Sequence, residues 1–563
     1  MKLSATEKGL FLELPPEALY TLGNSGIETI TKAATFTVAE PGDTPNSPPT
    51  YSDIALWRMR GARLRFPKGI RPLLPKDWVW DIQPGEDGEN IPLSLRPLTR
   101  FPVQLEPLQL DILETIRVKN ASGLIEAAMG AGKSWLLLAL ILGHPLLRPA
   151  AISGKGDKDT KQLIDKLKKL FVDNPQYAEP FMLSGLGRPL SKKDKKTLDA
   201  GEGIVICTHA GLQNLPENTR LLVLDEGHAA ATPKRVANLL KLPNLVKAFA
   251  LTGTAGLRGD GGDELLTGLI GKTIVSKGHE RFEATGRVAP AQINGYHFLG
   301  KGIYAENPFM PDQTPQEGYS YHSTWVENHR GRHEFVADLV LSLPHDETKV
   351  IFVPHILHAV RLCNAIEKKI YEKLGDLTLE ERENFKPVIF HAKADKADKF
   401  YISKEERDRR VALLEKGEIK VAVSTDFLST GFDTNMIDHI IDASGQKAII
   451  GNIQRSGRGI RPRLKPDGSA KITQIHTILD KTHHVLHKLG EKRFAALCAY
   501  YNHKEGVPNP DRPGGVTRFQ DPPWINQAER VQKLHPHETP AHLQNHGPAT
   551  FDPWAARKAA SNR

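Results

Sequence analysis

Cysteine is scarce in this 563-residue chain, and long apolar runs are missing from it. The three cysteines, at positions 207, 363 and 498, are too few and too scattered for a disulfide framework or a four-cysteine zinc site. The longest apolar run, from Trp135 to Leu142, is far shorter than the roughly 18 residues that a membrane-spanning helix needs. The first ten residues also lack the apolar core of a secretory signal. We therefore expect a cytoplasmic protein that does not enter a membrane.

The charge balance excludes little, because it is only mildly basic. Hydrophobic residues make up 39% of the chain and charged residues 25%, a composition typical of globular proteins. The formal net charge of +9 suits a polyanionic partner, although many proteins of this charge bind none. A chain of this length is expected to form roughly two to four domains.

Two regions of the chain alternate short apolar strands with helical stretches, which predicts parallel α/β sheets. In the first region the expected strands are 123–127, 204–207, 221–224 and 248–251. In the second region they are 349–353, 388–390, 420–424 and 439–442, with a helix near 485–501. The predicted organisation is an α/β fold with a small β-rich N-terminal domain (1–100), a first α/β domain (101–295), a connector (296–325), a second α/β domain (326–504) and an extended Pro/His-rich tail (505–563).

Arginines alternate along the N-terminal segment 55–66, which reads ALWRMRGARLRF. Period-2 spacing would place Arg58 and Arg60 on one face of a strand, and the next two arginines likewise. Such a face could hold a nucleic-acid backbone, with Trp57 and Phe66 stacking on bases. The alternative is a solvated edge strand whose charges guard against aggregation.

A glycine-rich stretch, AAMGAGKS at 127–134, lies between an apolar strand and an apolar helix, the context that a phosphate-binding loop needs. Glycine lets the backbone approach phosphates closely, and the N–H groups at the start of the helix bind the anion. Lys133 is predicted to reach the β- and γ-phosphates of ATP, and Ser134 to place its hydroxyl on Mg²⁺. The other predicted ATP contacts in this loop are Met129, Gly130, Ala131 and Gly132.

An acid pair follows the apolar strand 221–224 in the sequence LLVLDEGH. Asp225 is predicted to hold Mg²⁺, and Glu226 to polarise the attacking water. His228 is predicted to sense the state of the nucleotide. Two acids at the end of a buried strand are costly unless a cation or a donor satisfies them. Together with the loop upstream, this pair predicts hydrolysis of a nucleoside triphosphate.

With both motifs in place, residues 105–500 resemble a superfamily 2 DExH-type helicase, and the UvsW-type phage DNA helicases in particular. The resemblance implies two tandem RecA-like domains that share one ATP site and use ATP and Mg²⁺. It implies that Gln109 reads the adenine edge. It also implies that Thr252 and Thr254, in Thr-Gly-Thr, couple hydrolysis to movement of the domains.

The second half carries the rest of the implied site. Gly431 and Asp433 match a family motif that contacts ATP from the second domain. The string QRSGRGIR matches a further motif, so the resemblance implies catalytic roles for Gln454, Arg458 and Arg461. A guanidinium suits a γ-phosphate because its planar fork donates two hydrogen bonds. The two arginines are therefore expected to act as fingers that stabilise the transition state.

Contact with a nucleic-acid strand is expected to be mostly to phosphates. Lys155, Thr208 and His209 in the first half, and Thr430 in the second, occupy positions that resemble the strand-contacting motifs of the family. For each of them, the alternative is an ordinary turn.

The resulting hypothesis is an ATP-dependent DNA helicase or translocase that moves on or remodels branched DNA. Two alternatives stay open: an RNA helicase, and a nucleic-acid-stimulated ATPase that acts as a non-unwinding switch or motor subunit. The expected partners are nucleic acid, with DNA favoured over RNA, and proteins of replication or recombination. We expect a monomer in the cytoplasm, that of a bacterial host if the chain is phage-encoded.

Overall fold

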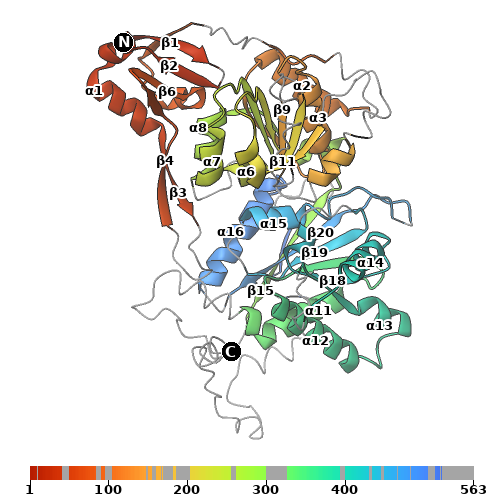
Figure 1. Ribbon diagram of the computed structural model, residues 1–563. Helices are drawn as coiled ribbons and strands as arrows, with labels where there is room; N and C mark the ends of the chain where they lie inside the picture. Colours follow the sequence, from red (N-terminus) through yellow and green to blue (C-terminus); the bar gives the residue numbers. More distant parts are fainter. Residues whose placement is uncertain are drawn as a thin grey trace.

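The computed structural model of the chain consists of an N-terminal β domain followed by two parallel α/β domains (Figure 1). It describes residues 1–8, 10–40, 50–83, 91–95, 104–147, 150–154, 160–166, 168, 182–185, 203–254, 261–299, 326–392, 400–429, 434–445, 449–465, 467–481, 484–504, 514–519 and 522. Within these residues, no helix combines the length and the apolar character needed to traverse a bilayer.

The N-terminal domain is a five-stranded sheet in the order β5-β6-β2-β1-β7, with helix α1 beside it and a separate β3-β4 arm that projects from it (Figure 1). Its elements are β1 (Lys2–Lys8), β2 (Phe11–Leu14), α1 (Pro16–Ala33), β3 (Thr35–Glu40), β4 (Thr50–Ala55), β5 (Arg58–Arg60), β6 (Arg63–Pro67), the 3-10 helix η1 (Lys68–Leu73) and β7 (Val79–Gln83). Its apolar residues share one core with those of the first α/β domain. The Leu10 N–H also donates to the Leu245 carbonyl at 2.9 Å. The β domain is therefore fused to the first α/β domain.

The arginine-rich segment forms β5 and β6, and much of it faces inward. The Arg65 side chain is buried and donates to the Pro243 carbonyl at 2.9 Å. Arg63 pairs with the nearly buried Glu13 at 2.9 Å. Phe66 is fully buried in the shared core, so the prediction that it stacks on bases is wrong. The period-2 pattern located the strands, but the packing against the first α/β domain decided which face is covered.

The first α/β domain is a seven-stranded parallel sheet in the order β10-β11-β9-β12-β13-β8-β14. Its strands are β8 (Gly123–Ala127), β9 (Ala150–Gly154), β10 (Met182–Gly185), β11 (Ile204–Thr208), β12 (Leu221–Leu224), β13 (Lys247–Thr252) and β14 (Thr273–Lys277). Its helices are α2 (Pro107–Lys119), α3 (Lys133–Leu142), η4 (His209–Asn214), α6 (Gly227–Ala230), α7 (Pro233–Leu239), α8 (Gly262–Ile270) and α9 (His279–Ala284). All seven residues of 136–142 in α3 are buried, which explains the apolar run in the sequence.

The second α/β domain is another seven-stranded parallel sheet, in the order β17-β18-β16-β19-β20-β15-β21. Its strands are β15 (Ala291–Phe298), β16 (Thr348–Phe352), β17 (Pro387–Phe390), β18 (Val421–Ser424), β19 (Ile437–Asp442), β20 (Thr473–Asp480) and β21 (Gly515–Phe519). Its helices are α11 (Arg330–Ser342), α12 (Ile356–Glu372), α13 (Leu379–Phe385), α14 (Lys404–Glu415), η5 (Asp426–Ser429), α15 (Ile449–Ser456) and α16 (His484–Tyr500). The expected alternation of strands and helices is confirmed in both domains.

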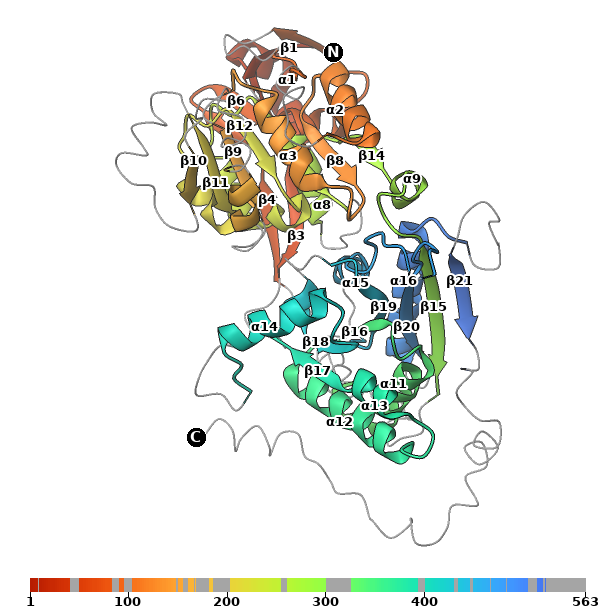
Figure 2. The same cartoon turned by 90° about the vertical axis from the view of Figure 1, so that its right-hand side faces the viewer.

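Two predicted boundaries need correction. Residues up to 295 were assigned to the first domain, but β15 pairs along its whole length with β20 of the second sheet. The tail was expected to begin at 505, but β21 lies beyond that point and pairs with β15 in the same sheet. Figure 2 shows α9 and then β15 where the chain passes from the first domain to the second. Neither strand is among those predicted from the sequence, because its place in the second sheet is decided by long-range pairing.

The two α/β domains share a continuous apolar core at their boundary. Tyr501, just after α16, is fully buried, and its ring lies 4.6 Å from that of His279 in α9. The Tyr501 hydroxyl is also 2.8 Å from the Ser456 hydroxyl at the end of α15. The boundary is therefore a packed interface in which α16 contacts elements of both domains.

Candidate active site

The loop between β8 and α3 forms a tight backbone cradle. Gly130 and Gly132 have φ of 80° and 76°, a region that favours glycine. A Cβ atom on Gly132 would lie 2.5 Å from Gln109 Nε2, and one on Gly130 would lie 2.9 Å from Val288 Cγ1. A side chain at either position would therefore strain the backbone and displace a neighbouring side chain, and α3 begins directly behind the loop. A helix N-terminus fronted by such a loop fits the phosphates of a nucleotide.

The lysine of this loop meets the acid pair that follows β12. Lys133 Nζ lies 3.2 Å from Glu226 Oε1. Glu226 has a φ of 47°, a left-handed conformation that is uncommon outside glycine and clusters at functional sites. The Glu226 N–H donates to Asp225 Oδ1 at 3.0 Å, which orients that carboxylate. The cation and both acids thus gather at the carboxyl ends of parallel strands, where ligands of α/β sheets bind.

His228 joins the acid pair to the second domain. Its Nδ1 lies 3.0 Å from Thr252 Oγ1 and 3.4 Å from Glu226 Oε2. Its Nε2 lies 3.2 Å from Gln454 Nε2 across the domain boundary. With the amide nitrogen as the donor, Nε2 accepts, and a neutral ring carries its proton on Nδ1. The Thr254 N–H donates to Thr252 Oγ1 at 3.1 Å, so both threonines singled out in the sequence lie in this contact.

The arginines of the QRSGRGIR string lie just beyond α15, at the same boundary. Arg461 extends to the phosphate loop, where its guanidinium donates to the Gly130 carbonyl at 3.2 Å. Arg458 lies in the turn between α15 and Arg461 and is partly buried. The Ala289 N–H donates to the Ile460 carbonyl at 2.7 Å, which ties this loop to the segment that links the domains. The second domain therefore brings cationic side chains to a phosphate loop that belongs to the first.

Gln109 is turned toward the phosphate loop. Its Nε2 donates to the Ala131 carbonyl at 2.8 Å, and its Oε1 accepts from the Glu106 N–H at 3.0 Å. The second contact is half of a capping box at the start of α2. Both ends of the amide are thus used by the protein itself, and Gln109 supports the shape of the loop. Its reading of an adenine edge stays a prediction.

Several residues predicted from the sequence are not placed in the site described above. Lys155, Thr430, Gly431 and Asp433 lie outside the described residues. His209 is 1% exposed, and its Nδ1 lies 2.8 Å from Ser153 Oγ. Burial is the main cause that lowers the pKa of His209 to about 4, so its ring is neutral. The prediction that the His209 side chain contacts a nucleic-acid strand is therefore wrong. The side chain instead links the ends of β9 and β11.

Tyr500 makes a contact with the phosphate loop that the sequence did not predict. It ends α16 in the second domain, and its hydroxyl accepts the Met129 N–H of the phosphate loop at 3.0 Å. Burial raises the pKa of that hydroxyl, so it stays protonated. An aromatic residue at the end of a helix carries no signal of such a role, because the contact joins residues far apart in the sequence.

Comparison with known proteins identifies the second domain. Residues 336–463 match the family model described as the helicase conserved C-terminal domain. The match runs from α11 through the whole QRSGRGIR string. No curated protein matches the chain.

One solved structure shares the fold of the chain, and two others show weaker similarity. The ATP-dependent Type ISP restriction-modification enzyme LlaBIII, bound to DNA, is 15% identical with a TM-score of 0.50, over 83% of this chain and 35% of that one. The helicase Lhr of Mycobacterium smegmatis, bound to ssDNA and AMP-PNP, is 17% identical with a TM-score of 0.42, over 71% of this chain and 50% of that one. T4 UvsW is 18% identical with a TM-score of 0.35, over 92% of this chain and 100% of that one. The chain thus spans half of the Lhr chain and about a third of the LlaBIII chain.

A helicase C-terminal domain therefore faces a domain that supplies a phosphate loop and an acid pair. The two parallel sheets have the fold of paired RecA-like domains, and the candidate site lies between them. Residues 336–463 are therefore similar to the helicase conserved C-terminal domain, and the chain shares its α/β fold with LlaBIII.

Proposed function

We propose that the chain is an ATP-dependent DNA helicase or translocase that couples hydrolysis to movement on, or remodelling of, branched DNA. The observation that carries the proposal is a continuous polar path from Lys133 through Glu226 and His228 to Gln454. The path starts at the phosphate loop and ends in the second domain. Any change at the γ-phosphate is thereby passed to the domain boundary.

The chemistry follows from the same residues. The Lys133 ammonium and the loop N–H groups hold the β- and γ-phosphates. Lys133 turns from Glu226 to the γ-phosphate, so the carboxylate becomes free to orient a water. The water oxygen then forms a bond to γ-phosphorus, the bond to the β,γ-bridging oxygen breaks, and the water proton passes to Glu226. Mg²⁺, held by Ser134 and Asp225, would neutralise phosphate charge.

Movement follows because neither domain holds a complete site. The first supplies the loop and the acids, and the second supplies Gln454, Arg458 and Arg461. Binding of ATP closes the boundary, and loss of the γ-phosphate releases it. A strand that lies across both domains is then moved by each cycle. We propose Thr208, Lys155 and Thr430, with Arg58 and Arg60 of the N-terminal domain, as its contacts.

DNA is proposed over RNA because the Thr-Gly-Thr string and the segment Gly286–Pro290 resemble the UvsW-type group in sequence. The test is the ATPase rate of the whole chain with single-stranded DNA, duplex DNA, four-way DNA and RNA. We expect stimulation by DNA, greatest with branched substrates, together with unwinding in a strand-displacement assay. Stimulation by RNA alone would replace the proposal with an RNA helicase. DNA stimulation without displacement or translocation would replace it with a non-unwinding switch.

Lys133→Ala is the control for this experiment. We expect it to abolish hydrolysis while the circular dichroism spectrum stays that of the wild type. Turnover that persists in the variant would show that the loop at 127–134 is not the ATP site.

A further inference from the structure

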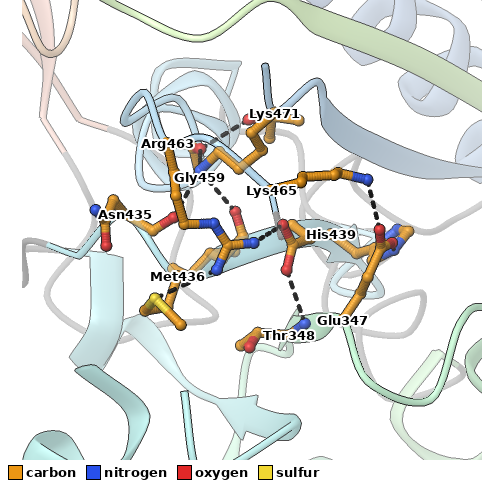
Figure 3. Close-up of polar contacts among 12 residues, drawn as sticks. Glu347, Thr348, Asn435, Met436, His439, Gly459, Arg463, Lys465 and Lys471 are labelled. Carbon is orange, nitrogen blue, oxygen red and sulfur yellow. Dashed lines mark hydrogen bonds and ion pairs between the residues drawn. The ribbon is translucent and has the colours of Figure 1, made fainter. Parts of the chain in front are cut away.

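The Lys471 ammonium is buried among main-chain oxygens rather than carboxylates. The residue is 1% exposed. Its Nζ donates to the carbonyl of Gly459 at 2.7 Å and to those of Asn435 and Ile437, each at 3.0 Å. An ammonium has three N–H donors, and all three are used here. Figure 3 shows Lys471 directed at Gly459 and the neighbouring chain, while Lys465 extends the other way to Glu347.

The three carbonyls belong to two segments that serve the ATP site. Gly459 lies between Arg458 and Arg461, in the loop 457–463 that presents the two predicted arginine fingers and is called the finger loop below. Asn435 and Ile437 lead into β19, shortly after the predicted ATP contact Asp433. Lys471 therefore binds the finger loop to the start of a central strand of the sheet.

A second donor holds the same carbonyl. Thr473 Oγ1 donates to the Gly459 carbonyl at 2.7 Å. The backbone is pressed against the sheet at this point, because a Cβ on Gly459 would lie 2.6 Å from Thr473 Cγ2 and 2.9 Å from Ile440 Cδ1. The main-chain N–H of Lys471 also donates to the Arg463 carbonyl at 2.9 Å. Both ends of the finger loop are thus fixed by the stretch that begins β20.

The carboxylate to consider for Lys471, that of Asp438, is already engaged by other donors. Asp438 is occupied by Arg463, at 2.5 Å, and by the Thr348 N–H, at 3.0 Å. Burial is the main cause that lowers the pKa of Lys471 to about 7, with Arg463 and Arg461 contributing and Asp438 opposing. A neutral amine has only two N–H donors for three carbonyls, so the full set of contacts belongs to the ammonium.

We propose that Lys471, together with Thr473, is a positioning residue for ATP hydrolysis. By holding the Gly459 carbonyl against the start of β19, the pair sets where Arg458 and Arg461 stand relative to the phosphate loop. The inference rests on the proposed ATPase function. It goes beyond that function by assigning a role to residues outside every motif identified in the sequence.

The test compares Lys471→Met, Thr473→Val and a matched control, Lys465→Met, in the full chain with saturating DNA. Lys465 lies on the same segment, but its side chain extends away from Gly459 and pairs with Glu347 at 2.6 Å. We expect Lys471→Met to lower kcat about 10- to 100-fold, as for a misplaced catalytic group, and Thr473→Val to lower it less. The Kd for a fluorescent ATP analogue should change less than about twofold, because ground-state binding does not need the fingers. Lys465→Met should match the wild type.

A merely structural role is separated by combining each variant with the paired change Arg458→Ala and Arg461→Ala, which removes both fingers. If Lys471 acts through the fingers, the combined variant hydrolyses ATP no more slowly than the chain that lacks both arginines. Effects that multiply in the combined variant would overturn the proposal. A normal kcat in both Lys471→Met and Thr473→Val, with the chain that lacks both arginines impaired, would overturn it as well. If Lys471→Met does not fold, the Thr473→Val cycle gives the same decision. A wild-type chain without hydrolysis would instead overturn the proposed function, and this inference with it.

Discussion

The contact between Gln454 and His228 allows a sharp prediction, because it is a polar link across the domain boundary at the ATP site. The two residues are 9% and 5% exposed, and their side-chain nitrogens are 3.2 Å apart. Gln454→Ala removes this hydrogen bond and leaves His228 Nε2 without its donor. A buried hydrogen bond contributes about 0.5–1.5 kcal/mol, and an unsatisfied polar group costs about 1–3 kcal/mol.

We expect the contact to act mainly in the aligned, hydrolysing state, so the loss appears in the barrier. A loss of about 1–2 kcal/mol corresponds to a fall of about 5- to 30-fold in kcat. The KM for ATP should stay within about twofold, since Gln454 contacts His228 at the domain boundary rather than the β8–α3 loop. The assay is steady-state hydrolysis at saturating DNA. Gln474→Ala is the matched control, because Gln474 pairs with Asn294 inside the second sheet, at 3.0 Å.

A cycle with His228→Ala checks that the loss comes from this contact. The double variant should be no slower than His228→Ala alone, because the partner is already gone. An unchanged kcat in Gln454→Ala, or fully multiplicative effects in the double variant, would refute the reasoning.

Two further predictions concern pH and salt. The Glu347 carboxylate accepts from His439 and Lys465, each at 2.6 Å, and these contacts, the one with His439 foremost, hold its pKa at about 2 against an ordinary value of 4.5. Because the pKa of Glu347 is lower in the folded protein, the stability that its carboxylate contributes is complete above about pH 4.5 and is lost as pH falls toward 2. Glu347→Gln should therefore make Tm fall less steeply between these two pH values. Equal slopes of Tm against pH in the variant and the wild type would contradict this. Arg58 is exposed on the edge strand β5, so Arg58→Ala should reduce the slope of log Kd for DNA against log salt concentration by about 1. Arg63→Ala is the control and should leave the slope unchanged, because the Arg63 guanidinium is already paired with Glu13. An unchanged slope for Arg58→Ala would assign β5 to a solvated edge.

The parts of the site that could be predicted are those encoded by contiguous residues. AAMGAGKS fixes two glycines before a helix, so the phosphate cradle follows from local backbone freedom and the helix N-terminus. LLVLDEGH places two acids at the end of a buried strand, and this too could be predicted because the acids directly follow the apolar run. The strand 221–224 forms with the predicted bounds, because an unbroken apolar run suits a strand covered on both faces.

The parts that could not be predicted depend on distant segments. The position of His209 directly after β11 predicts a contact with nucleic acid, but its ring is buried against Ser153 in β9. The arginines of β5 and β6 follow one pattern, yet Arg65 is buried because the first α/β domain packs on it. Burial is a property of the neighbour as much as of the residue, so period-2 alternation alone does not decide it.

The sequence by itself predicted two α/β halves, which the structure confirms, and it assigned part of a candidate ATP site to each. Only the tertiary structure decided how those parts meet: Arg461 on the Gly130 carbonyl, Gln454 on His228, and Lys471 beneath the finger loop. It also assigned β15 and β21 to the second sheet. The physical reason is range. Local strings specify backbone shape and charge over a few residues, whereas strand pairing and buried hydrogen bonds join residues hundreds of positions apart, and those partners are chosen only when the whole chain packs.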